Sequence, residues 1–466
     1  MREHDTDKPN IIVILSDDQG AWAMGCAGNK EIRTPNLDRL AAEGMRYSSF
    51  FCTSPVCSPA RASLLTGRMP SQHGVHDWIR EGNVGENAIE YLQGQTSYTE
   101  VLANHDYNCG ISGKWHLGDS INPQKGLTHW YTHQSGGGYY YNAPMIREGE
   151  LVTESGYLTD VITDDALNFL DKQKHEEPFY LSVHYTSPHT PWIDSHPQEI
   201  VDSYDDCLFE SCPQEPLHPW QLRNEPYWDN RKENLKGYYA AVTAMDQNIG
   251  RIIDKLEEMG VREQTLICFL SDNGFNCGHH GIWGKGNGTF PLNMFDTSVK
   301  VPAIFSQPGR IPQGQVCDEL VSGYDFMPTI LEYAGLHHPV MDNLPGRSFL
   351  PLLLGKEKNV HDHVVIYDEY GPVRMIRTRE WKYIHRYPYG PHELYHVAID
   401  PDEKNNVFDD PACSEIRMEM KSKLENWFVH YVDPALDGTH EAVYGLGQLN
   451  LAGPAGKGTK AYAEFE

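Results

Sequence analysis

Two short acidic stretches repeat one local pattern at distant places in the chain. The apolar run IIVIL is followed by Ser-Asp-Asp at 16–18, and the run LICFL is followed by Ser-Asp-Asn at 271–273. Carboxylate and amide oxygens without a neighbouring His or Cys are the ligands that hard cations such as Ca²⁺ or Mg²⁺ prefer. An acidic residue after a strand can also cap the next helix. Two matched pairs favour the cation, because adjacent carboxylates repel each other unless a positive charge lies between them. The candidate ligands are Asp17, Asp18, Asp272 and Asn273.

Four basic or proton-carrying side chains follow comparable apolar pieces or lie in loops. Lys114 and His116 follow the short strand-like piece CGISG, and His189 lies between two prolines. Lys285 stands in the Gly-rich stretch HHGIWGKGNG, a few residues beyond the second acidic pair. A lone loop Lys is usually solvated and a lone loop His usually packs. Together, however, these groups predict a site that binds and cleaves a small oxyanion ester.

The stretch FFCTSPVCSPARASLLTGR at 50–68 contains two thiols. Pro59 is typical of the first turn of a helix and Gly67 of its end, so Cys57 is expected at a helix N-terminus. Backbone N–H groups and the helix dipole favour an anion there, and they would also lower the pKa of the Cys57 thiol. Cys52 has no such setting and is expected to be a small buried residue.

The elements that must position these groups alternate between strands and helices. Strands are expected at 10–18, 179–185 and 265–274. Helices are expected at 34–44, with Thr34 as N-cap and Gly44 as stop, and at 235–256, closed by Gly260. This alternation predicts an α/β fold with a large, mostly parallel sheet sandwiched by helices. Ligands of such sheets bind beyond the carboxyl ends of the strands, where both acidic pairs would lie.

The pattern changes near residue 355. Short strands with turns, such as VRMIRT and WKYIHRY, precede one helical stretch at 414–431. We therefore expect a catalytic α/β domain at 1–355 and a smaller C-terminal α+β subdomain with an antiparallel sheet at 356–466.

Composition limits the partners. The chain carries 38 basic and 65 acidic side chains, a formal charge of −27. Such a surface opposes binding to nucleic acid or to an anionic membrane, so an anionic substrate must be recognised by a few local cations. No apolar run reaches the ~20 residues of a membrane span, and the start MREHDTDKPN lacks a signal segment. A cytoplasmic location is expected, or a periplasmic or secreted one if a leader has been removed. The ten cysteines, including Cys207 and Cys212, are expected to be reduced.

The motif C-x-P-x-R, formed by Cys57, Pro59 and Arg61, resembles the signature of the formylglycine-dependent sulfatases of the cysteine type, in the alkaline phosphatase superfamily. The resemblance continues along nearly the whole chain, through NIIVILSDDQG, TPNLDRLAAEGMRY, GKWHLG, PHTPW, SDNG, HGIWGKG, VPAIFSQPGRI and ELYHVAIDPDEKNN. It implies that a maturation enzyme oxidises Cys57, and not Cys52, to formylglycine.

The resemblance also implies a role for each candidate residue. Arg61 would hold the modified side chain. The four acidic-stretch residues, with residue 57, would bind the metal, usually Ca²⁺, and Lys114, His116, His189 and Lys285 would bind sulfate and transfer protons. One hydroxyl of the hydrated aldehyde would attack sulfur, and His189 or Lys285 would protonate the departing alcohol. His116 would then take a proton from the second hydroxyl, which expels sulfate; an unmodified Cys or Ser has no such hydroxyl.

The expected substrate is a sulfated carbohydrate, small or at a chain end. Its specificity should come from loops at 73–83, 135–144 and 192–234. The candidate contacts are His76, Asp77, Trp78, Arg80 and His280. Alternatives are an aryl or steroid sulfatase, a phosphonate monoester or phosphodiester hydrolase that uses the same aldehyde, and a non-catalytic binder of sulfated ligands. The last is disfavoured because every catalytic candidate is present.

Overall fold

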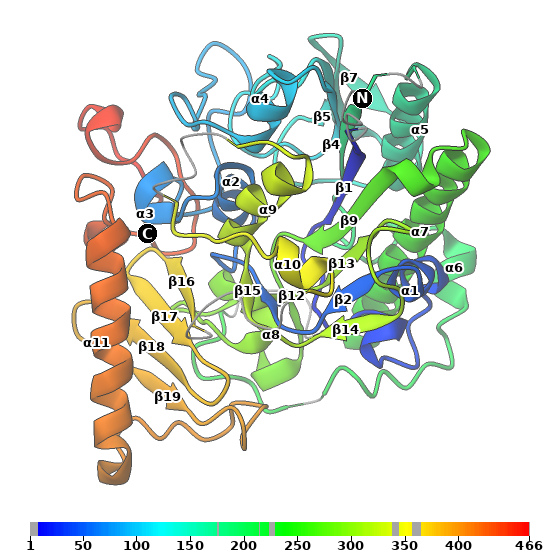
Figure 1. The fold of residues 1–466 in the computed structure, drawn as a ribbon. Helices are drawn as coiled ribbons and strands as arrows, with labels where there is room; N and C mark the ends of the chain where they lie inside the picture. Colours follow the sequence, from blue (N-terminus) through cyan, green and yellow to red (C-terminus); the bar gives the residue numbers. More distant parts are fainter. Residues whose placement is uncertain are drawn as a thin grey trace.

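The computed structural model describes residues 8–174, 177–213, 215–222, 229–337, 344–356 and 365–465 (Figure 1). Its main feature is a ten-stranded sheet. In spatial order the strands are β14 (Gln315–Cys317), β2 (Met45–Tyr47), β13 (Ala303–Ser306), β9 (Thr265–Ser271), β1 (Asn10–Ser16), β8 (Phe179–His184), β4 (Asn108–Gly113), β5 (His129–His133), β6 (Ala143–Arg147) and β7 (Glu150–Glu154). The five strands from β9 to β5 run parallel, whereas β13, β6 and β7 run antiparallel to their neighbours. The predicted fold class is confirmed.

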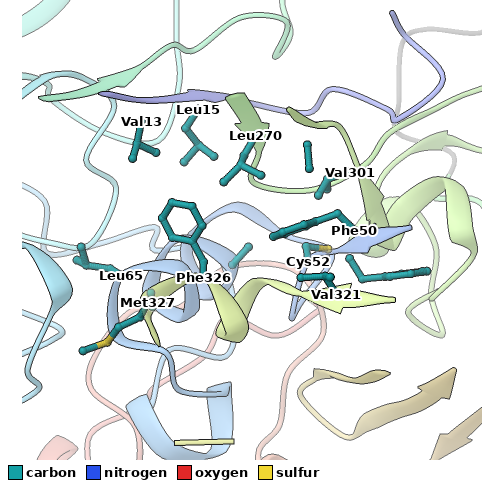
Figure 2. Packing of buried hydrophobic residues seen from close by; sticks show 14 of the residues in the cluster. Val13, Leu15, Phe50, Cys52, Leu65, Leu270, Val301, Val321, Phe326 and Met327 are labelled. Carbon is teal, nitrogen blue, oxygen red and sulfur yellow. The ribbon is translucent and has the colours of Figure 1, made fainter. Parts of the chain in front are cut away.

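Strand β1 lies in the middle of this sheet and is buried on both faces. Because side chains alternate along a strand, Val13 and Leu15 face one layer of helices while Ile12 and Ile14 face the other. The first layer contains α2 (Cys57–Thr66), α4 (Tyr98–Ala103) and α9 (Phe326–Tyr333), and the second contains α1 (Pro35–Ala42), α5 (Leu158–Asp171) and α7 (Arg231–Glu258). Figure 2 shows Val13 and Leu15 pointing toward Phe326 of α9. Burial on both faces explains why the strand reads as a continuous apolar run.

Helix α1 begins after Thr34, as predicted, but its cap differs from the prediction. The Thr34 hydroxyl accepts from Gly25 N instead of from the helix. The carboxylate of Asp246, on α7, accepts from Asn36 N and Leu37 N at 3.1 and 2.8 Å. The end also differs: the helix stops at Ala42. Gly44 is required for a different reason, because a Cβ there would lie 2.2 Å from Phe305 O of β13.

The C-terminal part carries an antiparallel sheet in the order β16 (Ile366–Tyr370), β17 (Val373–Arg377), β18 (Lys382–Arg386) and β19 (Glu393–Tyr395), with α11 (Ser414–Tyr431) beside it. The boundary predicted between 355 and 356 adjoins residues 357–364, which lie outside the described residues, and it stays a prediction. The last segment, red in Figure 1, returns to α3 (Pro70–His73), where Asp433 N donates to Ser71 O. Within the described ranges, no helix combines the length and apolar character of a membrane span.

Candidate active site

Both predicted acidic pairs lie at one edge of the sheet, beyond the carboxyl ends of β1 and β9. These strands pair in parallel, with Ser16 opposite Ser271, so the residues after them emerge side by side. Asp18 N donates to Asp272 Oδ1 at 3.3 Å, and Asn273 Nδ2 donates to Asp18 Oδ1 at 2.8 Å. Asp18 adopts a left-handed conformation with φ of 65°, which turns its carboxylate toward the second pair. All four side chains of the two pairs are buried.

The oxygen atoms of this cluster fit a hard cation. Asp17 Oδ1 and Asn273 Oδ1 are fully buried and have no hydrogen-bond partner among the described residues. One ligand atom each from Asp17, Asp18 and Cys57 lies within 4.8 Å of the others. Buried oxygens without donors are costly unless something positive binds them. The residues therefore suit the metal that the resemblance implies.

Three buried cations compensate the acids. Lys114 Nζ lies 2.5 Å from Asp17 Oδ2, and Lys285 Nζ lies 2.5 Å from Asp18 Oδ1. Arg61, on α2, contacts Asp272 Oδ2 through Nε at 2.9 Å and Nη2 at 2.8 Å. Burial by itself raises the pKa of the Asp17 and Asp18 carboxyls. The neighbouring ammonium groups and His189 outweigh burial, so both pKa values are lowered and both acids stay ionised.

Cys57 is the first residue of α2, as predicted, and Gly67 ends the helix in a left-handed conformation. Its Sγ accepts from Lys285 Nζ at 2.8 Å. The expected lowering of the thiol pKa is wrong: burial raises the pKa of Cys57 to about 12, despite Lys114 and Lys285. Desolvation of a thiolate here exceeds the stabilisation by the two lysines, and the nearby carboxylates of Asp17 and Asp272 raise the pKa further. The unmodified side chain is therefore a protonated thiol, not a thiolate nucleophile.

The two candidate histidines are held by backbone carbonyls, which fixes the role of each ring nitrogen. His116 Nε2 lies 2.9 Å from Ile79 O; since a carbonyl only accepts, Nε2 carries the proton and Nδ1 carries a lone pair. Burial, with Lys114 next, lowers the pKa of His116 well below its usual value, so the ring is a neutral base. His189 Nδ1 donates to Thr190 O at 2.7 Å and leaves Nε2 3.8 Å from Asp18 Oδ2.

A pocket of about 350 Å³ opens above these groups. Its lining is Cys57, Trp78, Ile79, Arg80, His116, Ser135, Gly136, Gly137, His189, Lys285 and Asn287. A Cβ on Gly136 would lie 2.2 Å from the His116 ring, and one on Gly137 would lie 3.1 Å from the His189 ring. The loop at 135–138 therefore packs its bare backbone directly against both histidines.

Two of the five predicted substrate contacts line this pocket, namely Trp78 and Arg80. His76 is buried and contacts Leu436 O and Gln448, while Asp77 accepts from Tyr370 Oη at 2.5 Å and Gly447 N at 2.9 Å. His280 stacks on Phe295, with ring centroids 4.0 Å apart. These three residues are not part of the pocket lining, and their contact with substrate stays a prediction.

The sequence analysis missed Asn287 and the segment 445–448, which supports the pocket wall. The sequence could have indicated Asn287 as a pocket residue, since it lies two residues after Lys285 in the same Gly-rich stretch. No sequence feature indicated segment 445–448, because it is far along the chain from every motif. The thiols agree with expectation: Cys52 is buried, and all ten cysteines, including Cys207 and Cys212, are unpaired in the structure.

Known proteins resemble this chain over most of its length. The model of the sulfatase family matches residues 9–336, and a model described as N-sulphoglucosamine sulphohydrolase, C-terminal, matches 278–429. An N-acetylglucosamine-6-O-sulfatase of Bacteroides thetaiotaomicron is 28% identical, over 93% of this chain and 88% of that protein. The N-acetylgalactosamine-6-sulfatase of Canis lupus familiaris is 32% identical, over 80% and 71%.

A solved structure in complex with its substrate D-glucosamine-2-N,6-O-disulfate superposes with a TM-score of 0.79. It is 25% identical, and the match covers 93% of this chain and 100% of that one. The sulfatase family model covers well over half of the chain, in the region that builds the acidic cluster and the pocket. The chain therefore belongs to the sulfatase family and is a sulfuric ester hydrolase.

Proposed function

We propose that this enzyme removes sulfate from a sulfated carbohydrate, either a small sugar or the end of a chain. The observation that carries the proposal is the pocket itself: Lys285 and Cys57 lie in contact within a lining that includes no carboxylate among the described residues. A volume of about 350 Å³ is in the range of sites for single small ligands. The sugar sulfatases named among the relatives support the substrate class.

Residue 57 is proposed to act as formylglycine and the cation as Ca²⁺, held by the acidic cluster and residue 57. The formylglycine would supply a hydrated aldehyde as nucleophile, and the cation would act as a Lewis acid on the sulfate oxygens. Lys114 and Lys285 place positive charge beside the ester sulfate. His189 faces the cluster with Nε2 and is placed to protonate the leaving oxygen, with Lys285 as the alternative donor. His116 is neutral and accepts a proton at Nδ1.

The test requires protein in which conversion of Cys57 has been measured by mass spectrometry of its peptide. Conversion is expected to depend on co-expression of a formylglycine-generating enzyme. N-acetylglucosamine-6-sulfate, N-acetylgalactosamine-6-sulfate, an aryl sulfate, an aryl phosphodiester and an aryl phosphonate are then compared by kcat/KM. We expect sulfate release, fastest from a sugar. A converted enzyme that prefers the aryl sulfate would overturn the substrate class, and one that cleaves only the phosphorus esters would overturn the proposed reaction.

A further inference from the structure

Arg80 differs from the other cations of the site. Lys114, Lys285 and Arg61 are buried, and each contacts a carboxylate at 2.5 to 2.9 Å. Arg80 is exposed and lines the same pocket, and its guanidinium forms no ion pair with any acid in the described part of the chain. Its exposure places it at the mouth of the pocket, whereas Lys285, the paired cation that also lines the pocket, is buried.

Arg80 lacks an acidic partner among the described residues, although the chain as a whole is rich in acidic side chains. The chain has 65 acidic and 38 basic side chains, so an exposed arginine would ordinarily find a carboxylate nearby. Yet the described lining of the pocket contains Arg80 and Lys285 and no Asp or Glu. Positive groups in a concave site without acids concentrate anions there. Lys285 already contacts Cys57, so the Arg80 guanidinium is available to a second anionic group.

Segment 445–448 holds the wall on which Arg80 stands. Arg80 N donates to Gln448 O at 2.8 Å. Trp78 Nε1 and Asn287 Nδ2 both donate to Gly445 O at 3.1 Å. A Cβ on Gly447 would lie 2.8 Å from Arg80 Cβ and 3.0 Å from the Trp78 ring, so the glycine backbone packs directly against both side chains. The mouth of the pocket is thus an organised wall and not an unsupported loop.

We propose that Arg80 binds a second anionic group of the substrate, distinct from the sulfate that is removed. This inference rests on the proposed function. The group is a carboxylate or a second sulfate, carried by the sulfated sugar or by the ring next to it. A guanidinium presents a planar pair of donors that matches either oxyanion. Trp78 and Asn287 line the same pocket and are placed to contact the sugar between the two anions.

The experiment compares pairs of substrates in which a neutral group replaces the second anion. One pair is D-glucosamine-2-N,6-O-disulfate and N-acetylglucosamine-6-sulfate. The other is a 6-sulfated disaccharide with a uronate and its carboxyl-reduced counterpart. Binding is measured by calorimetry on Cys57→Ser protein, which does not depend on maturation, and kcat/KM is measured on converted enzyme. Arg80→Met keeps the side-chain stem and removes the charge; Arg379→Met removes the same charge outside the pocket, where Arg379 pairs with Asp318 and Glu319.

We expect one dianionic substrate to bind more tightly than its monoanionic partner, and the pair that does so identifies the anion. Arg80→Met should reduce that preference ~10- to 100-fold, the usual effect of losing a charged hydrogen bond, while Arg379→Met keeps it. Arg80→Lys should retain part of it. If neither pair shows a preference, or if Arg80→Met weakens both members of a pair equally, the inference is wrong although the sulfatase remains. If no sugar sulfate binds or turns over, the proposed function itself fails.

Discussion

Replacing Gly136 by alanine should impair His116, the proposed general base, without changing that side chain. A Cβ at this position would lie 2.2 Å from Cε1 and 2.3 Å from Nε2 of His116, whereas real Cβ contacts stay above 3.0 Å. The loop at 135–138, the His116 ring or both must therefore shift by about 0.8 Å in total, which disturbs the fit between them. The His116 ring cannot rotate freely to escape the contact, because it is buried and its Nε2 donates a hydrogen bond to Ile79 O. A misplacement of this order costs ~100-fold in rate, and complete loss of a general base costs ~10²- to 10⁴-fold.

The same loop provides matched controls. A Cβ on Gly137 would lie 3.1 Å from His189, a tight contact, and one on Gly138 would lie 3.5 Å from His133, an ordinary contact. Alanine at 136, 137 and 138 should thus give a severe, an intermediate and a negligible loss of kcat, with similar melting temperatures. Sulfate release is assayed with equal formylglycine content in every variant. Equal activity of Gly136→Ala and Gly138→Ala would refute the role assigned to the His116 ring position.

Three further predictions concern the thiols, the metal and a buried acid. Cys57→Ser should abolish turnover and Cys52→Ser should largely keep it; equal losses in two folded variants would contradict the assignment of Cys57. Ca²⁺ should bind Asp17 and Asn273 and raise the free energy of unfolding by about 2.7 kcal/mol at 100 times its Kd, which is read as a higher melting temperature and exceeds the effect of Mg²⁺. No shift in wild type, or the same shift in Asp17→Asn, would argue against this site. Burial raises the pKa of Asp246 from 3.8 to about 6, so its stabilising contribution is complete below pH 3.8 and is lost as the pH rises through 6. Chemical denaturation should show wild type losing up to about 3 kcal/mol relative to Asp246→Asn between pH 4 and 7, and a constant difference would be inconsistent with the shift.

The acidic residues of the site were predictable because they directly follow short apolar runs that are typical of buried strands. Parallel strands bring their carboxyl ends to one edge, so the acids after β1 and β9 had to meet there. The helix at Cys57 was also predictable, since Pro59 and Gly67 mark its two ends. These are properties of short segments, and short segments are read directly from sequence.

Long-range packing decided the rest. The sequence suggested Thr34 as the cap of α1, but Asp246, more than two hundred residues away, took that role because α7 lies against the helix start. A helix N-terminus suggested a thiolate at Cys57, but the burial that only the complete fold produces raised its pKa to about 12. Both errors arise from judging a group by its neighbours in the chain.

The pocket wall shows the same division. The type and position of Trp78 and Arg80 predict substrate contacts, and the same signals apply to His76 and Asp77, which come just before them. Only the tertiary structure separates them, because Gln448, Gly447 and Tyr370 bind His76 and Asp77 and turn them into supports. The sequence by itself determined which chemistry this protein can perform. The return of the C-terminal segment to the edge of the sheet decided which side chains line the pocket, because burial and contact depend on the whole chain.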